Sequence, residues 1–280
     1  GADGAVGSLG TGEVIDNSQL RFDRTGTLDV PNSISGTGNV TIDCPPGAGT
    51  IVLRGTNSFT GGVTVNSGAL RITSGSALGS GTKTITLNNG TVGAPQLRLD
   101  GSSSAIELPR TITYATSSNT GALINEAGSN TVSGDITITG GGGDTKILVS
   151  AGTLTLTGSL APNTTGRTLQ LSGTGTGIIT GAITNNGLNL LNIAKNDAGT
   201  WLLSGTNTYT GTTTVNAGTL ALGSASALGS GGPNFGNNSG GCSVLAGATL
   251  DLNGQTGVNE VVTLRGAGVG GNGALVNSSG

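Results

Sequence analysis

The chain has 280 residues and a net charge of -3; glycine accounts for 55 of them, whereas charged residues make up 9% and aromatic residues 2%. With 11 Lys plus Arg in total and no basic run, the sequence excludes nucleic-acid binding by phosphate neutralisation. No stretch approaches the length of about 18 apolar residues that spans a membrane, and no signal peptide follows Gly1, so we expect a mature secreted piece or a segment of a longer protein.

A short strand motif introduced by a glycine turn recurs along nearly the whole chain. Its clearest copy is Gly-Thr-Leu-Ala-Leu at 218–222, where apolar and smaller or polar residues alternate as in a β-strand. In chain order the eleven copies are 26–30, 49–53, 68–72, 96–99, 121–124, 152–156, 168–171, 199–203, 218–222, 248–252 and 273–276. Ten intervals cover the 247 residues from Gly26 to Gly273, a mean of about 25, which is a period typical of solenoids.

This period predicts an all-β fold, a parallel β-helix of about eleven rungs that forms a single domain over residues 1–280. We expect one copy per rung, with Leu, Ile and Val stacked inside and Thr, Ser, Asp and Arg outside, as in Leu70-Arg71-Ile72. Helical signals are limited to one short turn at 74–79 and another at 224–229.

The best internal duplication matches residues 49–81 with 199–231, at an offset of 150, and 20 of the 33 positions are identical. Phe59 and Tyr209 share one repeat position, where we expect them to cover a corner of the coil rather than to hold a ligand. Asn66 and Asn216 follow a strand, where their amides are expected to bond at the bend and to form ladders.

The segments 203–211, 214–220 and 227–231 carry the motifs Gly-Thr-Asn-Thr-Tyr-Thr-Gly, Thr-Val-Asn-Ala-Gly-Thr-Leu and Ala-Leu-Gly-Ser-Gly. They resemble the autotransporter-associated β-strand repeat, which is found in passenger regions of bacterial surface proteins. The resemblance implies a right-handed parallel β-helix, an extracellular location at the bacterial outer cell surface, and a role as stalk or adhesin. It is specific at 199–231, good at 49–81 and loose elsewhere.

The residues that usually carry catalysis are scarce. The sequence has no histidine, which excludes Ser-His-Asp and Cys-His arrangements and histidine metal sites. Its 14 acidic residues are scattered, and Asp100 and Asp251 follow the repeat, so their place in the coil explains them. We therefore expect no enzyme, no catalytic or cofactor-binding residue, no metal site and no cofactor.

The densest charged zone lies near the N-terminus. It consists of Asp16, Asp23, Asp29 and Asp43 with Arg21 and Arg24. We interpret it as a solvated face or cap; the alternatives are a contact to another chain and a catalytic cluster.

The two cysteines, Cys44 and Cys242, are expected to lie eight rungs apart, about 38 Å at the usual strand spacing. A disulfide needs Cα atoms within about 7 Å, so an internal bridge is excluded. Two independent thiols are the favoured interpretation, and a bridge between chains is the alternative.

Two further patterns suggest binding sites. Gly140-Gly141-Gly142-Gly143-Asp144 is similar to a calcium-binding glycine-rich repeat, but its spacing differs and it occurs once, so we expect a loop. Thr-x-Thr strands at 84–86, 111–113, 137–139 and 153–155 would suit ice binding only if they aligned on adjacent rungs, and their uneven spacing argues against it.

The sequence thus favours a structural extracellular stalk, adhesin segment or fibre subunit. The alternatives are a polysaccharide-acting enzyme and a glycan- or ice-binding module on the same fold. We expect the chain to begin and end within the solenoid, without polar capping repeats. The expected partners are therefore another copy of the chain, end to end, or adjoining segments of the same coil. A host or neighbouring-cell surface is a further possible partner, with no nucleic acid and no membrane span.

Overall fold

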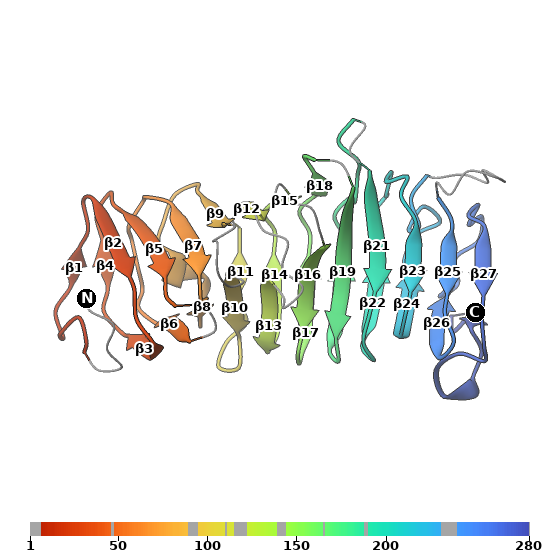
Figure 1. Ribbon diagram of the computed structural model, residues 1–280, viewed down its shortest axis with the longest axis horizontal. Helices are drawn as coiled ribbons and strands as arrows, with labels where there is room; N and C mark the ends of the chain where they lie inside the picture. Colours follow the sequence, from red (N-terminus) through yellow and green to blue (C-terminus); the bar gives the residue numbers. More distant parts are fainter. Residues whose placement is uncertain are drawn as a thin grey trace.

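The computed structural model describes residues 7–45, 48–88, 95–109, 111–114, 122–138, 144–164, 166–187, 190–230 and 240–279. In these segments the chain forms short parallel strands and two single 3₁₀ turns, η1 (Gly75–Leu78) and η2 (Val269–Gly271), without an α-helix. Figure 1 shows the coils following one another along the long axis in sequence order, from the N-terminus to the C-terminus. The expected β-solenoid is confirmed.

Each complete coil has three sides. The first side is an eleven-stranded sheet, here called the long sheet. Its strands are β3 (Gly26–Val30), β6 (Gly49–Leu53), β8 (Ala69–Ile72), β10 (Gln96–Asp100), β13 (Leu123–Ala127), β16 (Asp144–Val149), β19 (Arg167–Gly173), β21 (Leu191–Lys195), β23 (Thr213–Val215), β25 (Cys242–Val244) and β27 (Val262–Leu264). Its eleven strands agree with the expected number of rungs.

The other two sides are an eight-stranded and a seven-stranded sheet, preceded by the two-stranded pair of β1 (Val14–Ile15) and β4 (Ile34–Ser35). The eight-stranded sheet contains β11 (Glu107–Leu108), β14 (Ser129–Val132), β17 (Thr153–Leu156), β20 (Thr176–Ile179), β22 (Thr200–Leu203), β24 (Gly218–Leu222), β26 (Ala248–Asp251) and β28 (Leu275–Val276). The seven-stranded sheet contains β2 (Gln19–Phe22), β5 (Asn39–Asp43), β7 (Val63–Ser67), β9 (Thr84–Leu87), β12 (Thr111–Tyr114), β15 (Ile136–Ile138) and β18 (Leu160–Pro162).

The core is a set of files of stacked side chains that run along the axis. On the long sheet one file continues through ten coils by exact strand register. Its members are Leu28, Ile51, Leu70, Leu97, Leu123, Ile147, Leu171, Lys195, Val215 and Val244, all of them buried. Alternation within each strand places one residue inside and the next outside, so a thin core needs few large side chains.

We expected the copies of the strand motif to form one file, but they do not. Six of them lie in the long sheet and five in the eight-stranded sheet, from 152–156 onward. The expectation was wrong because every side of the coil needs the same alternating strand, so the motif fits any side. The chain passes from the long sheet to the eight-stranded sheet, then to the seven-stranded sheet and back, as in β10, β11, β12 and β13.

The duplicated segments show this rotation directly. In 49–81 the strands β6 and β8 lie in the long sheet, whereas the matching strands β22 and β24 of 199–231 lie in the eight-stranded sheet. In the long sheet, β21 is the sixth strand after β6. The chain then continues from β21 to β22, which lies on the next side of the coil, in the eight-stranded sheet. The second segment is therefore six and one third turns beyond the first, which corresponds to about 24 residues per turn for the offset of 150.

Both cysteines are free and buried. Cys44 precedes β6 and Cys242 opens β25, and eight steps of the long sheet separate these two strands. The predicted separation of eight rungs is confirmed, and the burial of both thiols favours the interpretation as two independent thiols.

Candidate functional site

A buried asparagine joins three successive coils in each duplicated segment. The Asn207 Oδ1 accepts the Ile183 N–H at 2.8 Å from the coil before, and its Nδ2 donates to the Ala227 carbonyl at 2.7 Å in the coil after. Asn57 repeats this pattern with Ile34 and Ala77, at 2.8 and 2.6 Å. The side chain thus replaces strand pairing where the third side of the coil has none. We did not single out these two residues from the sequence, although both lie in the Gly-Thr-Asn motif.

The aromatic residue two positions later is fully buried in both segments. The Tyr209 hydroxyl bonds to the Thr213 hydroxyl at 2.7 Å. Over Phe59, the Lys83 ammonium lies 3.9 Å from the ring centroid and donates to the Phe59 carbonyl at 2.7 Å. Neither ring is presented to solvent, which agrees with the expectation that these aromatics do not hold a ligand.

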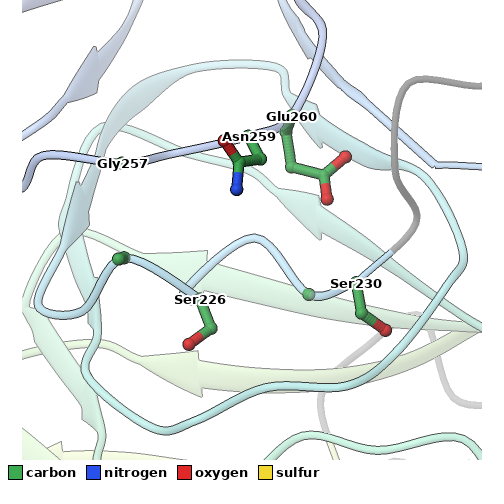
Figure 2. Close-up of a pocket in the computed structure, with 7 residues that line it drawn as sticks. Ser226, Ser230, Gly257, Asn259 and Glu260 are labelled. Carbon is green, nitrogen blue, oxygen red and sulfur yellow. The ribbon is translucent and has the colours of Figure 1, made fainter.

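A pocket of about 600 Å³ follows the second segment, between its last turn and the next coil. Its lining residues are Ala225, Ser226, Gly229, Ser230, Gly257, Asn259 and Glu260. Figure 2 shows the Asn259 amide and the Glu260 carboxylate projecting from the later coil toward the turn of the earlier one. Ser230 already donates to the Thr208 carbonyl at 3.1 Å. Sequence reasoning missed this pocket, because no motif marks the gap between two coils.

The electrostatics of this region are set by Glu260. Its Oε2 is buried and has no hydrogen-bond partner among the described residues. Burial, with a smaller contribution from the Glu260 charge, raises the pKa of the Cys242 thiol to about 12. Burial also raises the pKa of Tyr209, again with Glu260 as a minor contributor. The thiol is therefore inert at neutral pH.

The N-terminal charged zone forms surface ion pairs. Arg21 contacts Asp23 at 3.0 Å and Asp43 at 2.8 Å, and Asp29 pairs with Arg54 at 2.8 Å. These side chains are between one third and just over half exposed. Exposed pairs of this kind stabilise proteins little, so Arg21, Asp23, Asp29 and Asp43 fit the interpretation as a solvated face. Asp16 and Arg24 do not fit it, because both side chains are buried.

Asp100 and Asp251 hold turns at the ends of their strands. The Asp251 carboxylate accepts the backbone N–H of Asn253 at 2.8 Å, and its two oxygens accept the N–H and hydroxyl of Ser278. Burial opposes ionisation of Asp251, but these hydrogen bonds outweigh it and lower the pKa of its carboxyl. Asp100 is similar, since bonds from Ser102 and the charge of Arg71 overcome burial and lower its pKa. Their place in the coil explains both residues, as predicted.

The asparagine ladder predicted at the strand ends is present. Asn88 donates to Asn66 at 3.1 Å, and Asn216 donates to Asn196 at 2.7 Å. Each pair joins adjacent coils at the same bend.

Three of the four threonine strands share a register file on one sheet, contrary to the argument from their spacing. On the seven-stranded sheet, one register position holds Thr in five successive coils: Thr41, Thr64, Thr86, Thr113 and Thr137. Loops of different length absorb the uneven spacing and return each strand to register. The strand 153–155 lies on the eight-stranded sheet, in a second file of Ser129, Thr153, Thr176, Thr200, Thr219 and Thr249.

Most of the large apolar side chains that remain exposed lie in the first and last coils. Leu9 and Ile15 are exposed in the first coil, Ile15 by 69%. Val261, Leu264, Val269 and Leu275 are exposed in the last, and Leu190 is the exception between them. Among the described residues, β3 and β27, the outermost strands of the long sheet, each pair with one neighbouring strand of that sheet. Both terminal coils thus present open edges with apolar side chains.

In the described part of the chain, no helix is long and apolar enough to cross a membrane. The same residues contain no group of three or more His, Cys, Asp or Glu placed to hold a metal ion. The glycine run 140–143 lies outside the described residues, whereas Asp144 begins β16 and accepts a bond from Gln170 at 2.5 Å.

Comparison with known proteins identifies the repeated segments. The family model described as the passenger-associated-transport-repeat matches residues 47–72 and 193–222. A 74-residue stretch, 26% of the chain, is 43% identical to the adhesin BmaC autotransporter of Brucella suis biovar 1 (strain 1330), and this match covers 2% of that adhesin. No solved structure matches. The two model matches begin close to the duplicated segments and include their asparagine, aromatic and strand motifs. The chain therefore carries the autotransporter passenger repeat, as the resemblance implied, and builds it into a β-solenoid.

Proposed function

We propose that the chain is a structural segment of an extracellular passenger, a stalk or adhesin rod displayed at the bacterial outer cell surface. The observation that carries the proposal is the continuous eleven-stranded sheet, which includes strands of the passenger repeats. It forms one side of a solenoid whose interior is filled with packed side chains. Such a rod acts as a spacer and exposes a long surface, and neither role needs catalytic residues. An enzymatic role on polysaccharides has less support, because the acidic side chains that lie together in the described part of the chain, Asp23 with Asp43 and Asp100 with Glu126, are each paired with one shared arginine.

Within this role, copies of the chain stack end to end. The supporting features are the open edges of β3 and β27 and the aliphatic side chains exposed in the terminal coils, such as Ile15 and Leu264. Another coil laid on either end would pair these edges and cover these side chains, as adjacent coils do within the chain.

Sedimentation and negative-stain electron microscopy of the purified chain test the stacking. We expect concentration-dependent rods whose length is a multiple of the monomer, and Leu264→Asp should shorten them by placing a charge on the open edge. A monodisperse monomer at high concentration would contradict stacking, whereas the stalk role would be contradicted by reproducible turnover of a polysaccharide.

A flat binding face is the second candidate, and the threonine files favour it. Along the eight-stranded sheet, the outward positions of β14, β17, β20, β22 and β24 carry Thr, Ser and aliphatic residues and no charge. Hydroxyls repeat once per coil, about 4.8 Å apart. Ice recrystallisation assays test this function: Thr176→Lys with Thr200→Lys should abolish inhibition, and wild-type protein without any inhibition would rule it out.

A further inference from the structure

At the turn that ends each helical-turn motif, a lysine side chain packs against the first duplicated segment, whereas a pocket lies beside the second. In the first, Gly79 lies over the Phe59 carbonyl, and the Lys83 ammonium lies beside both. A Cβ placed on Gly79 would be 2.3 Å from that carbonyl oxygen and 2.9 Å from the Lys83 Nζ. A cation of the chain itself therefore occupies this place.

In the second segment the turn at Gly229 is built in the same way, but the sequence that follows it has no matching cation. Gly229 lies over the Tyr209 carbonyl in the same way, with 2.3 Å from its ideal Cβ to the oxygen. At the offset of 150 the sequence has Pro233 in place of Lys83, and residues 231–240 contain neither Lys nor Arg. Gly229 is one of the residues that line the pocket.

The opposite wall of this pocket supplies a negative charge. Glu260 projects toward the turn that contains Gly229 (Figure 2), and its buried Oε2 lacks a donor among the described residues. A buried carboxylate oxygen without a donor is costly, and a cation or hydrogen-bond donor removes that cost. The coil after the first segment is different, because the Glu107 carboxylate accepts the Ser133 hydroxyl at 2.6 Å.

We propose that this pocket binds a primary ammonium group from outside the solenoid, as carried by a lysine side chain or a free alkylamine. The ammonium lies where Lys83 lies in the first segment, donates to the Glu260 carboxylate, and reaches the Tyr209 carbonyl, which has a second lone pair beside the bond from Ser230. The volume of about 600 Å³ accommodates the alkyl chain as well. The site does not depend on the stacking of copies.

An amide-resolved NMR titration of the full chain tests the site. The probes are Nα-acetyl-lysine methylamide, n-butylamine and, as the uncharged match, Nα-acetyl-norleucine methylamide. We expect saturable shifts at Gly229, Asn259 and Glu260 with the first two probes and none with the third. Shifts with butylamine alone would assign the site to free amines. Absence of shifts with both amines, or equal shifts with norleucine, would overturn the proposal.

Variants separate this site from general attraction of amines to carboxylates. Glu260→Gln should weaken binding at least tenfold, whereas Glu107→Gln, in the coil after the first segment, should leave it unchanged. Equal loss in both glutamine variants would contradict the proposal.

Discussion

The two duplicated segments, 49–81 and 199–231, form the same backbone turn but pack different side chains inside it. Both close on themselves in 19 residues, Thr50 pairing with Ala69 and Thr200 with Thr219. Both use a buried asparagine between coils and a buried aromatic residue two positions later. They lie on different sides of the solenoid and against different neighbours. The repeat therefore specifies a turn of the coil, and the neighbouring coils decide how each turn is packed.

The largest difference between the segments is in the core, at the third residue. Trp201 packs on Gly177, its register partner, whereas the matching Ile51 packs on Leu28. A Cβ on Gly177 would lie 2.3 Å from indole atoms, so the glycine makes the room for the ring. We expect Trp201→Ala to cost about 4 kcal/mol and Ile51→Ala about 3 kcal/mol, because each leaves a cavity. Urea unfolding followed by circular dichroism measures both.

The reciprocal exchange sharpens the same comparison. Trp201→Ile with Gly177→Leu copies the pairing of the first segment, so the double variant should be more stable than either single variant. Additive losses would show that the two positions do not share one cavity.

The second comparison concerns Lys195, a buried charged residue that lies shortly before the second segment. Lys195 stands in an aliphatic core file where every other described member is apolar, and the offset of 150 puts Pro45 in its place before the first. Its ammonium donates to the carbonyls of Asn196, Asp197 and Ala217 at 2.7, 2.8 and 2.8 Å. Burial lowers the pKa of Lys195 from 10.5 to about 8, partly opposed by the Asp197 charge.

This shift predicts a pH dependence of stability with a defined sign. Between pH 8 and 10.5 the unfolded chain holds a proton that the folded chain has released, so Lys195 makes the free energy of unfolding rise with pH, by about 3 kcal/mol in total. The raised pKa of Cys242 acts in the opposite direction above pH 9. The difference between wild type and Lys195→Met, measured by urea unfolding across this range, isolates the lysine. Lys146→Met, on the outer side of the long sheet, is the control and should keep the wild-type profile.

The buried asparagines Asn57 and Asn207 should contribute equally to the stability of the two segments. Asn57→Ala and Asn207→Ala each leave one buried N–H and one carbonyl without a partner, so we expect about 2 kcal/mol in both. Hydrogen exchange should speed up at Ile34 and Ile183, whose N–H groups lose their acceptor. Asn216→Ala removes a bond in the exposed ladder and should cost much less. Unequal losses at 57 and 207 would show that the two coils are not equivalent.

The smallest effect concerns the turn-holding aspartates. Because the pKa values of Asp100 and Asp251 are lowered in the folded chain, each stabilises it above the ordinary value of 3.8 and loses that contribution as the pH falls through the folded value. Asp251→Asn should remove part of the acid dependence of unfolding and free Ser278 to exchange. Asp29→Asn, in an exposed ion pair, should change little.

The sequence predicted the solenoid and its rung number because inward residues must be apolar at regular spacing, and the Leu of each copy records that requirement. It also predicted the Asn66 and Asn216 ladders, since an amide at a bend bonds to its neighbour in the next coil. It did not predict which side a copy occupies. Ile51 pairs with Leu70 after 19 residues and Thr213 with Cys242 after 29, and periodicity alone does not assign such loops to corners.

The alignment of Thr86 with Thr113 and the pocket at Glu260 were missed for related reasons. Both depend on loops of unequal length, which place residues from distant parts of the sequence side by side. The two threonines, for example, are 27 residues apart in the sequence and are register partners in the sheet. Likewise, Asn57 and Asn207 read as turn residues in a Gly-Thr-Asn motif, and their partners in other coils are visible only in three dimensions.

The rotation of the second segment by one side of the coil is the central claim, and disulfide trapping tests it most directly. Thr200 lies between Thr176 and Thr219 on the eight-stranded sheet, so cysteine pairs at 176/200 and 200/219 should oxidise readily at the spacing of neighbouring strands. A pair at 170/200 should not, because Gln170 lies on the long sheet. The native Cys44 and Cys242 are buried and leave the assay undisturbed. Rapid bridging of 170/200, with none at 176/200, would place the segment on the same side as its twin and contradict the account.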